Sequence, residues 1–316
     1  MEVNKHNYMK DFFFTKIKSS LEKINESLEL KENILLKDLS WVNILNYNLG
    51  IKNLLNENFD EADNFFRKAI LEEKQKNSEL DLNFLFFNSE NNKKFELITT
   101  DILKNSDKVN NKFIGVGYLD NTKISEKLER EKINEAINLL KYSGKYYDEF
   151  NNLVEEVLFI GGTESLHIRS GSSLNMFGLI MIWCDEIHTI PYYLELLIHE
   201  TAHLRLFLEN LTDPLVLNNP DELYDAPFRN DSRPMIGIFH GLFVLTRIIV
   251  VMSIILEKLT PKDSQFSIEI KDKIERSKKK FDLTVIDIEK NGILTEKGLS
   301  IFQDCKNKIR YYLNHD

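Results

Sequence analysis

A long apolar segment in the second half of the chain sets the first limit on its fold. Residues 235–256 read MIGIFHGLFVLTRIIVVMSIIL, which is long enough to span a bilayer. His240 and Arg247 interrupt this segment, and an arginine inside hydrocarbon costs about 2.5 kcal/mol or more. A buried helix in the core of a soluble protein accounts better for the pattern, and we therefore expect no membrane partner.

The composition agrees with a soluble globular protein. The chain has 316 residues, 42% hydrophobic and 29% charged, which suffices for one large domain or two modest ones. Its net charge of −9 repels phosphate backbones, so we expect no nucleic-acid partner. Cys184 and Cys305 form no CxxC pair, and residues 1–18 lack the apolar run of a secretory signal. These features predict a cytoplasmic protein without a disulfide framework.

Hydrophobic periodicity divides the chain into three regions that we expect to pack as one unit. Residues 1–112 form an N-terminal helical region, although the run Asn83–Phe87 is also compatible with a strand. Residues 113–260 form the metal-binding core, and residues 261–316 form a C-terminal region of charged, amphipathic helices. The sequence thus predicts a mainly α (α+β) fold: a helical bundle-like domain with a small β-sheet or hairpin before the histidine helix.

The middle region alternates between helix and strand signals. Residues 125–158 have helical spacing, and residues 165–185 predict two short strands joined by a Gly/Ser turn. Pro191 then suits the first turn of a helix that runs from Tyr192 to about Asn210. A loop from residue 211 to residue 234 holds four of the six prolines and separates this helix from the apolar one.

The segment His199-Glu200-Thr201-Ala202-His203 carries the clearest chemical signal. Positions four apart on a helix share one face, so the two imidazoles can converge on one divalent ion, with Glu200 beside it. The flanks, LELLIHETAHLRLF, are apolar, and buried histidines and carboxylates are costly unless they are paired. This HExxH pattern predicts a metal site, and two hydrogen-bonded core histidines are the alternative.

Two histidines do not complete such a site, and the sequence offers two candidates for a third ligand. His240, in GIFHG, needs a strong partner in so apolar a helix, either a metal or a hydrogen bond in the core. Glu222, in NNPDELYDAP, lies 19 residues beyond His203, a separation that suits a zinc peptidase. An acid in a loop is also typical of a solvated surface, so the sequence leaves both candidates open.

Three pieces of sequence between Leu166 and Arg247 occur in an order that resembles one family. They are SGSSLNMFGLIMIWCDE, then LLIHETAHLRL, then YDAPFRNDSRPMIGIFHGLFVLTRI. The stretch resembles the HExxH-motif proteins encoded beside ribosomal peptide natural-product pathways. Members of that family are iron(II)- and 2-oxoglutarate-dependent oxygenases that hydroxylate a side chain of a precursor peptide, often at the β-carbon. The resemblance implies that His199, His203 and His240 bind iron, with 2-oxoglutarate as co-substrate and the precursor peptide as partner.

Such an oxygenase also needs a cation for the far carboxylate of 2-oxoglutarate. The planar fork of arginine suits a carboxylate best, because it can form two parallel hydrogen bonds. Arg229 and Arg233 lie in the loop between the histidine helix and His240, and Arg247 lies two turns beyond His240 on nearly the same helix face. All three are candidates, and ion pairs with nearby aspartates are the alternative for the first two.

Glu200 has a different role in each of two enzyme classes. In the oxygenase it orients a ligand or the substrate from beside the metal. In a zinc metallopeptidase with Glu222 as third ligand, it is the general base that activates metal-bound water. A third class is a peptide-binding scaffold whose metal site is structural. We take the oxygenase as the main prediction and the zinc peptidase as its alternative.

Overall fold

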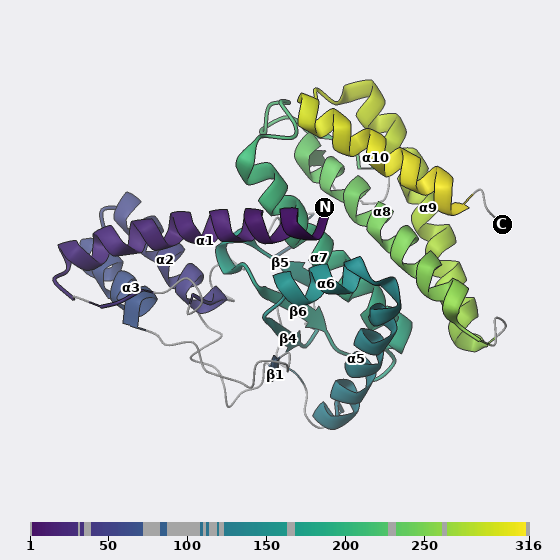
Figure 1. Cartoon of the computed structure of the whole chain (residues 1–316), viewed down its shortest axis with the longest axis horizontal. Helices are drawn as coiled ribbons and strands as arrows, with labels where there is room; N and C mark the ends of the chain where they lie inside the picture. Colours follow the sequence, from purple (N-terminus) through teal and green to yellow (C-terminus); the bar gives the residue numbers. More distant parts are fainter. Residues whose placement is uncertain are drawn as a thin grey trace. The chain divides into compact units, whose positions relative to one another are not determined.

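We describe the fold from a computed structural model of the chain (Figure 1). The structure describes residues 2–30, 32–34, 39–71, 83–86, 108–109, 112–113, 119, 123–162, 168–226, 232–260 and 264–313. The chain divides into two compact units, each built from two stretches. The sheet unit comprises Met1–Thr122 and Asn151–Cys184, and the histidine unit comprises Lys123–Phe150 and Asp185–Asp316. Helices dominate and accompany a small mixed sheet, so the expected mainly α (α+β) fold is confirmed.

The sheet unit contains a four-stranded sheet in the order β1-β4-β6-β5. β1 (Asn83–Phe86) and β6 (Leu179–Trp183) run parallel to β4 (Glu156–Ile160), and β5 (Ser170–Ser172) is antiparallel to β6. The two strands expected before the histidine helix are therefore present. The helical spacing expected up to residue 158 was wrong at its end, where β4 begins. An apolar run such as EVLFI, largely buried within a parallel sheet, has no period that separates it from a buried helix.

Helices cover one face of this sheet. Trp41, Leu45 and Leu49 of α2 (Trp41–Leu55) pack against alternate residues of the strands, which are Leu158, Ile160, Leu179 and Met181. On the opposite face, the ring of Phe159 contacts those of Phe84 and Phe86, at 6.0 and 4.7 Å between centroids. Figure 1 shows α1 (Glu2–Ser27) and α3 (Phe59–Leu71) beside α2, which contacts both. β2 (Lys108–Val109) and β3 (Lys112–Phe113) pair separately.

The histidine unit is a packed group of long helices. α7 (Ile190–Thr212) contacts α5 (Glu126–Leu140) and α8 (Met235–Lys258), and α8 also contacts α9 (Gln265–Asn291) and α10 (Glu296–Leu313) (Figure 1). The short strands β7 (Leu223–Tyr224) and β8 (Arg233–Pro234) pair within the connection between α7 and α8. The boundary between the two units falls within α6 (Lys145–Leu153). The predicted C-terminal helices are thus α9 and α10.

The apolar segment forms α8, which is the central helix of the histidine unit. This helix is long and apolar enough to cross a membrane, yet 72% of its most apolar window is buried inside the protein. Its interior positions contact the helices on either side, so protein rather than lipid surrounds it. The burial is that of a core helix in a soluble protein, as the interrupting His240 and Arg247 predict.

Candidate metal centre

Local sequence signals set the start of α7, which carries the histidine pair. The hydroxyl of Thr189 accepts a hydrogen bond from the backbone N–H of Tyr192 at 3.3 Å and caps the helix. Pro191 occupies the first turn, where no N–H is needed inside the helix. The expected span, Tyr192 to about Asn210, is confirmed to within two residues at each end.

Most of α7 is buried, and the histidines lie on its partly exposed stripe. Glu195, His199, His203 and Phe207 are partly exposed and follow one another at four-residue intervals, whereas the residues between them are buried. This interval keeps side chains on one face of a helix. The proposed ligands therefore lie where a metal and a substrate can reach them.

The His199 and His203 rings meet at a distance that suits a shared ion. Their Nε2 atoms lie 3.1 Å apart. Two nitrogens that each lie about 2.0–2.1 Å from one ion are about 2.8–3.4 Å apart at octahedral to tetrahedral angles. The observed separation falls inside this range, so the pair can bind an ion with little movement of either ring.

His240 on α8 joins the same group of rings but from the other side of His203. Its Nδ1 lies 3.1 Å from Nδ1 of His203, which is the nitrogen that faces away from His199. The centroids of these two rings are 5.4 Å apart, compared with 4.8 Å for His199 and His203. Because the nitrogen–nitrogen distances are equal, the His203–His240 contact is the more end-on of the two. The three imidazoles thus form a chain with His203 in the middle.

This arrangement fits an ion at two of the three histidines as they lie. One ion cannot contact both nitrogens of the His203 ring, because they point in different directions. Within the described part of the chain, no three His, Cys, Asp or Glu side chains converge as a finished metal site. Ligation by all three histidines therefore requires one ring to rotate, which side chains on a partly exposed stripe can do. The donor set of neutral imidazoles suits iron or zinc.

Burial keeps two of these imidazoles neutral. Desolvation holds the pKa of His203 well below 6.5, and the charges of His199 and His240 lower it further. Desolvation also lowers the pKa of His240 from 6.5 to about 4. A metal binds imidazole only in its neutral form, so at neutral pH no proton has to leave these rings before binding.

Glu200 is buried beside the open end of the cluster. Its carboxylate oxygen Oε1 lies 3.8 Å from Nε2 of His199, and its side chain is 2% exposed. This position suits a group that contacts a water or ligand on the metal rather than the ion itself. The geometry is compatible with both roles that the sequence leaves open for Glu200.

The structure separates the three candidate arginines. Arg229 lies outside the described residues. Arg233, in β8, has its side chain against Gly237, which lies three residues before His240 on α8; a Cβ at Gly237 would lie 3.6 Å from that of Arg233. Arg247 donates to Glu149 at 3.3 Å, and its guanidinium packs on the rings of Tyr146 and Phe243. Of the two described candidates, Arg233 is therefore the one whose side chain lies against the turn of α8 that precedes His240.

Glu222, the alternative third ligand, is exposed in the connection between α7 and α8. A hydrogen bond with Glu222 raises the pKa of the Tyr224 hydroxyl, so the carboxylate already interacts with β7. The structure brings His240, rather than Glu222, into contact with His203.

Phe207 is a neighbour of the cluster that the sequence reasoning missed. Its ring centroid lies 6.2 Å from that of His203 and 5.3 Å from that of His240. The signal was available, because Phe207 continues the four-residue interval of His199 and His203. Only the packing of α8 on α7, however, brings it to His240.

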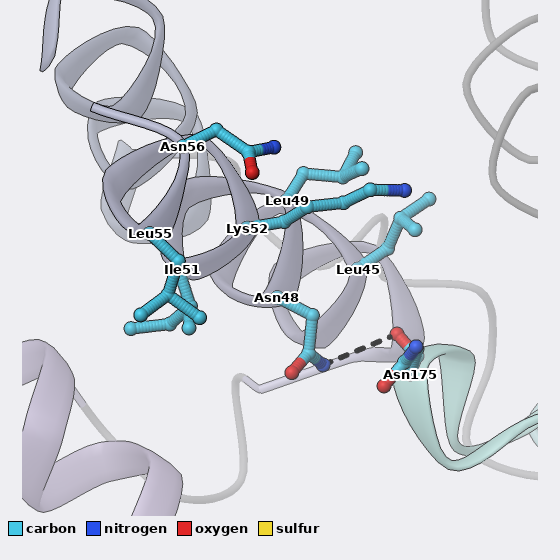
Figure 2. Close-up of a pocket in the computed structure, with 8 residues that line it drawn as sticks. All are labelled: Leu45, Asn48, Leu49, Ile51, Lys52, Leu55, Asn56 and Asn175. Atoms are coloured by element: carbon cyan, nitrogen blue, oxygen red, sulfur yellow. Dashed lines mark hydrogen bonds between the residues drawn. The ribbon is translucent and has the colours of Figure 1, made fainter. Parts of the chain in front are cut away.

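A groove in the sheet unit lies elsewhere, and no histidine, cysteine or carboxylate side chain lines it. It has a volume of about 300 Å³ and runs along α2, between Lys52 and Asn175 (Figure 2). Apolar and amide side chains line it together with Lys52, and Asn48 donates to the backbone carbonyl of Asn175 at 3.4 Å. A second, smaller pocket surrounds Arg247 and Thr201, on another face of α7 from the histidines. Neither pocket contains a histidine, so we place the chemistry at the partly exposed stripe.

Comparison with known proteins gives no further assignment: no protein-family model matches the chain, and no curated protein matches it.

Proposed function

We propose that this protein is an iron(II)- and 2-oxoglutarate-dependent oxygenase that hydroxylates a side chain of a ribosomally made precursor peptide, with the β-carbon as the expected position. The observation that carries the proposal is the pair of Nε2 atoms of His199 and His203, 3.1 Å apart on the partly exposed stripe of α7. His240 adjoins this pair within the stretch that resembles the HExxH oxygenases. The histidine pair thus supports a metal site, and the resemblance supports iron.

Each residue of the cluster has a separate task in this proposal. His199 and His203 hold the metal through Nε2, and His240 is the third ligand. The bound iron and 2-oxoglutarate supply the oxygen activation that side chains alone cannot provide. The chain itself holds the imidazoles neutral, keeps one side of the metal accessible and positions the peptide side chain. Glu200 orients a bound ligand from its buried position beside His199.

Arg233 is the residue that we assign to the far carboxylate of 2-oxoglutarate. Its side chain lies along Gly237, one turn before His240, on the same helix as a proposed ligand. Arg247 is less suited, because its guanidinium already donates to the buried carboxylate of Glu149. Moving it would break an ion pair with a buried carboxylate, which is destabilising.

A cytoplasmic location agrees with this function. Cys184 and Cys305 are both buried as thiols, and burial raises the pKa of Cys305 to about 11. A reducing compartment suits two such thiols and keeps iron in the ferrous state. We propose the cytoplasm on this basis.

The direct test uses protein purified without oxygen. It is incubated with iron(II), 2-oxoglutarate, oxygen and a precursor peptide encoded beside its gene, and the peptide is then weighed. We expect the mass of one oxygen atom to be added, and succinate to appear, only when 2-oxoglutarate is present. A peptide that stays unmodified while the protein holds iron would contradict the proposal.

The assignment of Arg233 is tested by Arg233→Gln in the same assay. We expect a KM for 2-oxoglutarate raised by at least about tenfold, because one charge-assisted hydrogen bond contributes about 1.5–3 kcal/mol. Iron binding should stay unchanged. The matched variant Arg247→Gln should instead lower the midpoint of thermal unfolding, and an unchanged KM in Arg233→Gln would exclude that residue as the anchor.

The buried position of Glu200 beside His199 favours one second candidate, a zinc metallopeptidase. In that enzyme Glu200 is the general base and Glu222 the third ligand. The exposure of Glu222 and its hydrogen bond with Tyr224 weigh against it. Peptide fragments formed with zinc alone, and lost in Glu200→Gln, would favour this candidate over the oxygenase.

A further inference from the structure

The histidine cluster has two different ends along α7. At one end lies His199, whose side chain is 35% exposed. At the other end lies Phe207, eight residues later and therefore about 12 Å farther along the helix axis. His203 lies between them, and His240 reaches it from α8. The two ends differ in what a molecule approaching the cluster would meet.

At the Phe207 end, one phenyl ring packs against two imidazoles that meet end-on. The ring centroid of Phe207 lies 5.3 Å from that of His240 and 6.2 Å from that of His203, and the two imidazole centroids are 5.4 Å apart. The three centroids thus form a nearly regular triangle. Phe207 is inclined by 25° to His203 and by 48° to His240. Centroid distances in this range are typical of favourable aromatic contacts. One phenyl ring thus contacts both imidazoles of the His203–His240 pair.

At the His199 end, the neighbouring side chains are charged and already paired. Glu195 lies one turn before His199, and its carboxylate accepts from Lys273 of α9 at 2.6 Å. Glu269 of α9 lies 3.7 Å from the same ammonium group. These groups border the open end without covering His199, whose ring keeps about a third of its surface exposed.

We propose that Phe207 is a positioning residue that, in the metal-free protein, packs on the His203 and His240 rings, limits their rotation and closes their side of the cluster, so that a ligand reaches the metal site past His199. The packing of Phe207 on both rings carries this inference. An apolar group beside metal ligands limits the access of water, and a ring packed on two imidazoles restricts the rotations open to them. Neither task depends on which metal is bound, so the inference is separate from the proposed oxygenase activity.

Chemical modification of the metal-free protein tests this proposal residue by residue. Diethyl pyrocarbonate modifies accessible neutral imidazoles, and fragmentation of the modified peptides by mass spectrometry gives a rate for each histidine. In the unmutated protein, we expect His199 to react several-fold faster than His203 and His240. Equal rates at all three histidines would overturn the proposal.

The decisive variant is Phe207→Ala, which removes the phenyl ring that packs on His203 and His240. We expect the rates of His203 and His240 to rise several-fold while that of His199 stays the same. Phe207→Leu, which retains an apolar side chain, should restore most of the protection and covers the case in which the alanine variant does not fold.

Two controls separate positioning from a general loosening of the fold. His188 is buried against the ring of Tyr192 at 3.7 Å, so its rate reports whether the histidine unit as a whole has opened. Phe243→Ala removes a buried ring from α8 that packs on Arg247. We expect this variant to leave the rates of His203 and His240 unchanged. A rise at His188 equal to that at His203 in Phe207→Ala, or the same rise in Phe243→Ala, would show that Phe207 only fills the core.

Discussion

At the scale of single residues, the positions of the three imidazoles decide what the cluster can bind. His203 faces His199 through Nε2 and His240 through Nδ1, so it belongs to both contacts. The spacing of His199 and His203 could be predicted from the sequence, because a helix sets it locally. The contact with His240 could not be predicted in the same way, because it depends on how α8 packs against α7. The choice between His240 and Glu222 is likewise a matter of tertiary structure.

The two candidate third ligands give opposite expectations for metal binding. We expect His240→Ala to weaken binding of cobalt(II), a stand-in for iron(II), by about 10–100-fold or more, the range found when groups around a metal ligand are removed. Glu222→Ala, a change at an exposed side chain, should leave the affinity unchanged. Competition with a coloured chelator measures both. A loss in Glu222→Ala and none in His240→Ala would support the peptidase ligand set.

The lowered pKa values of His203 and His240 predict an acid-sensitive fold in the metal-free protein. The unfolded chain takes up these protons near pH 6.5, whereas folded His240 does so only at about 4. The contribution of these histidines to the free energy of unfolding is therefore complete above pH 6.5 and falls as the pH drops towards 4. One pKa unit corresponds to about 1.4 kcal/mol, so His240 alone accounts for a loss of about 3 kcal/mol.

Urea unfolding at about pH 7.5 and about pH 5 measures this effect. His240→Gln should lose less stability between the two pH values than the unmutated protein. An equal loss in both proteins would mean that other groups cause the acid sensitivity.

At the scale of single elements, α7 and α8 were the most predictable parts of the fold. Their apolar patterns are long, and Pro191 and Pro234 mark where they begin. β4 was less predictable, because Glu156–Ile160 continues a helical pattern and forms a strand only by pairing with β1 and β6. Parallel partners distant in sequence leave no local signal. The four-residue spacing from Glu195 to Phe207 can be read from the sequence. Only the structure shows that these positions are partly exposed and that those between them are buried.

The space around two helical glycines, Gly298 in α10 and Gly237 in α8, gives a prediction about stability. A Cβ at Gly298 would lie 2.0 Å from the backbone oxygen of Leu215, which cannot move aside alone. Gly298→Ala should therefore destabilise the protein by about 1–3 kcal/mol. Gly237→Ala, at which the added carbon meets Arg233 only at 3.6 Å, should be neutral or stabilising by up to about 1 kcal/mol. Denaturant unfolding compares them, and equal losses in both variants would contradict the steric argument.

At the scale of the whole molecule, the chain is organised as two units that do not follow the sequence order. The three regions that we expected from composition and periodicity, 1–112, 113–260 and 261–316, are continuous, whereas each unit takes two separate stretches. Periodicity identifies elements but says nothing of which distant elements share a core. The mainly helical class was therefore predictable, and the grouping of the helices was not.

The burial of α8 predicts how the whole protein behaves without a membrane. Because protein surrounds most of this apolar helix, we expect the expressed chain to remain in the supernatant after high-speed centrifugation of a detergent-free lysate. Recovery only in a membrane pellet that detergent dissolves would mean that α8 inserts into lipid. An aggregate that detergent does not dissolve would indicate misfolding instead.

The order in which the histidine unit is synthesised follows from its two stretches. α5 leaves the ribosome well before α7, because residues 151–184 of the sheet unit are translated between them. The buried carboxylate of Glu129 can pair with Lys132 of the same helix at once, whereas Tyr193, whose hydroxyl also donates to it, is synthesised later. A gene fragment that encodes only residues 185–316 would leave this side of α7 uncovered. Isolating the cluster for spectroscopy thus calls for residues 123–150 to be joined to that fragment by an engineered linker.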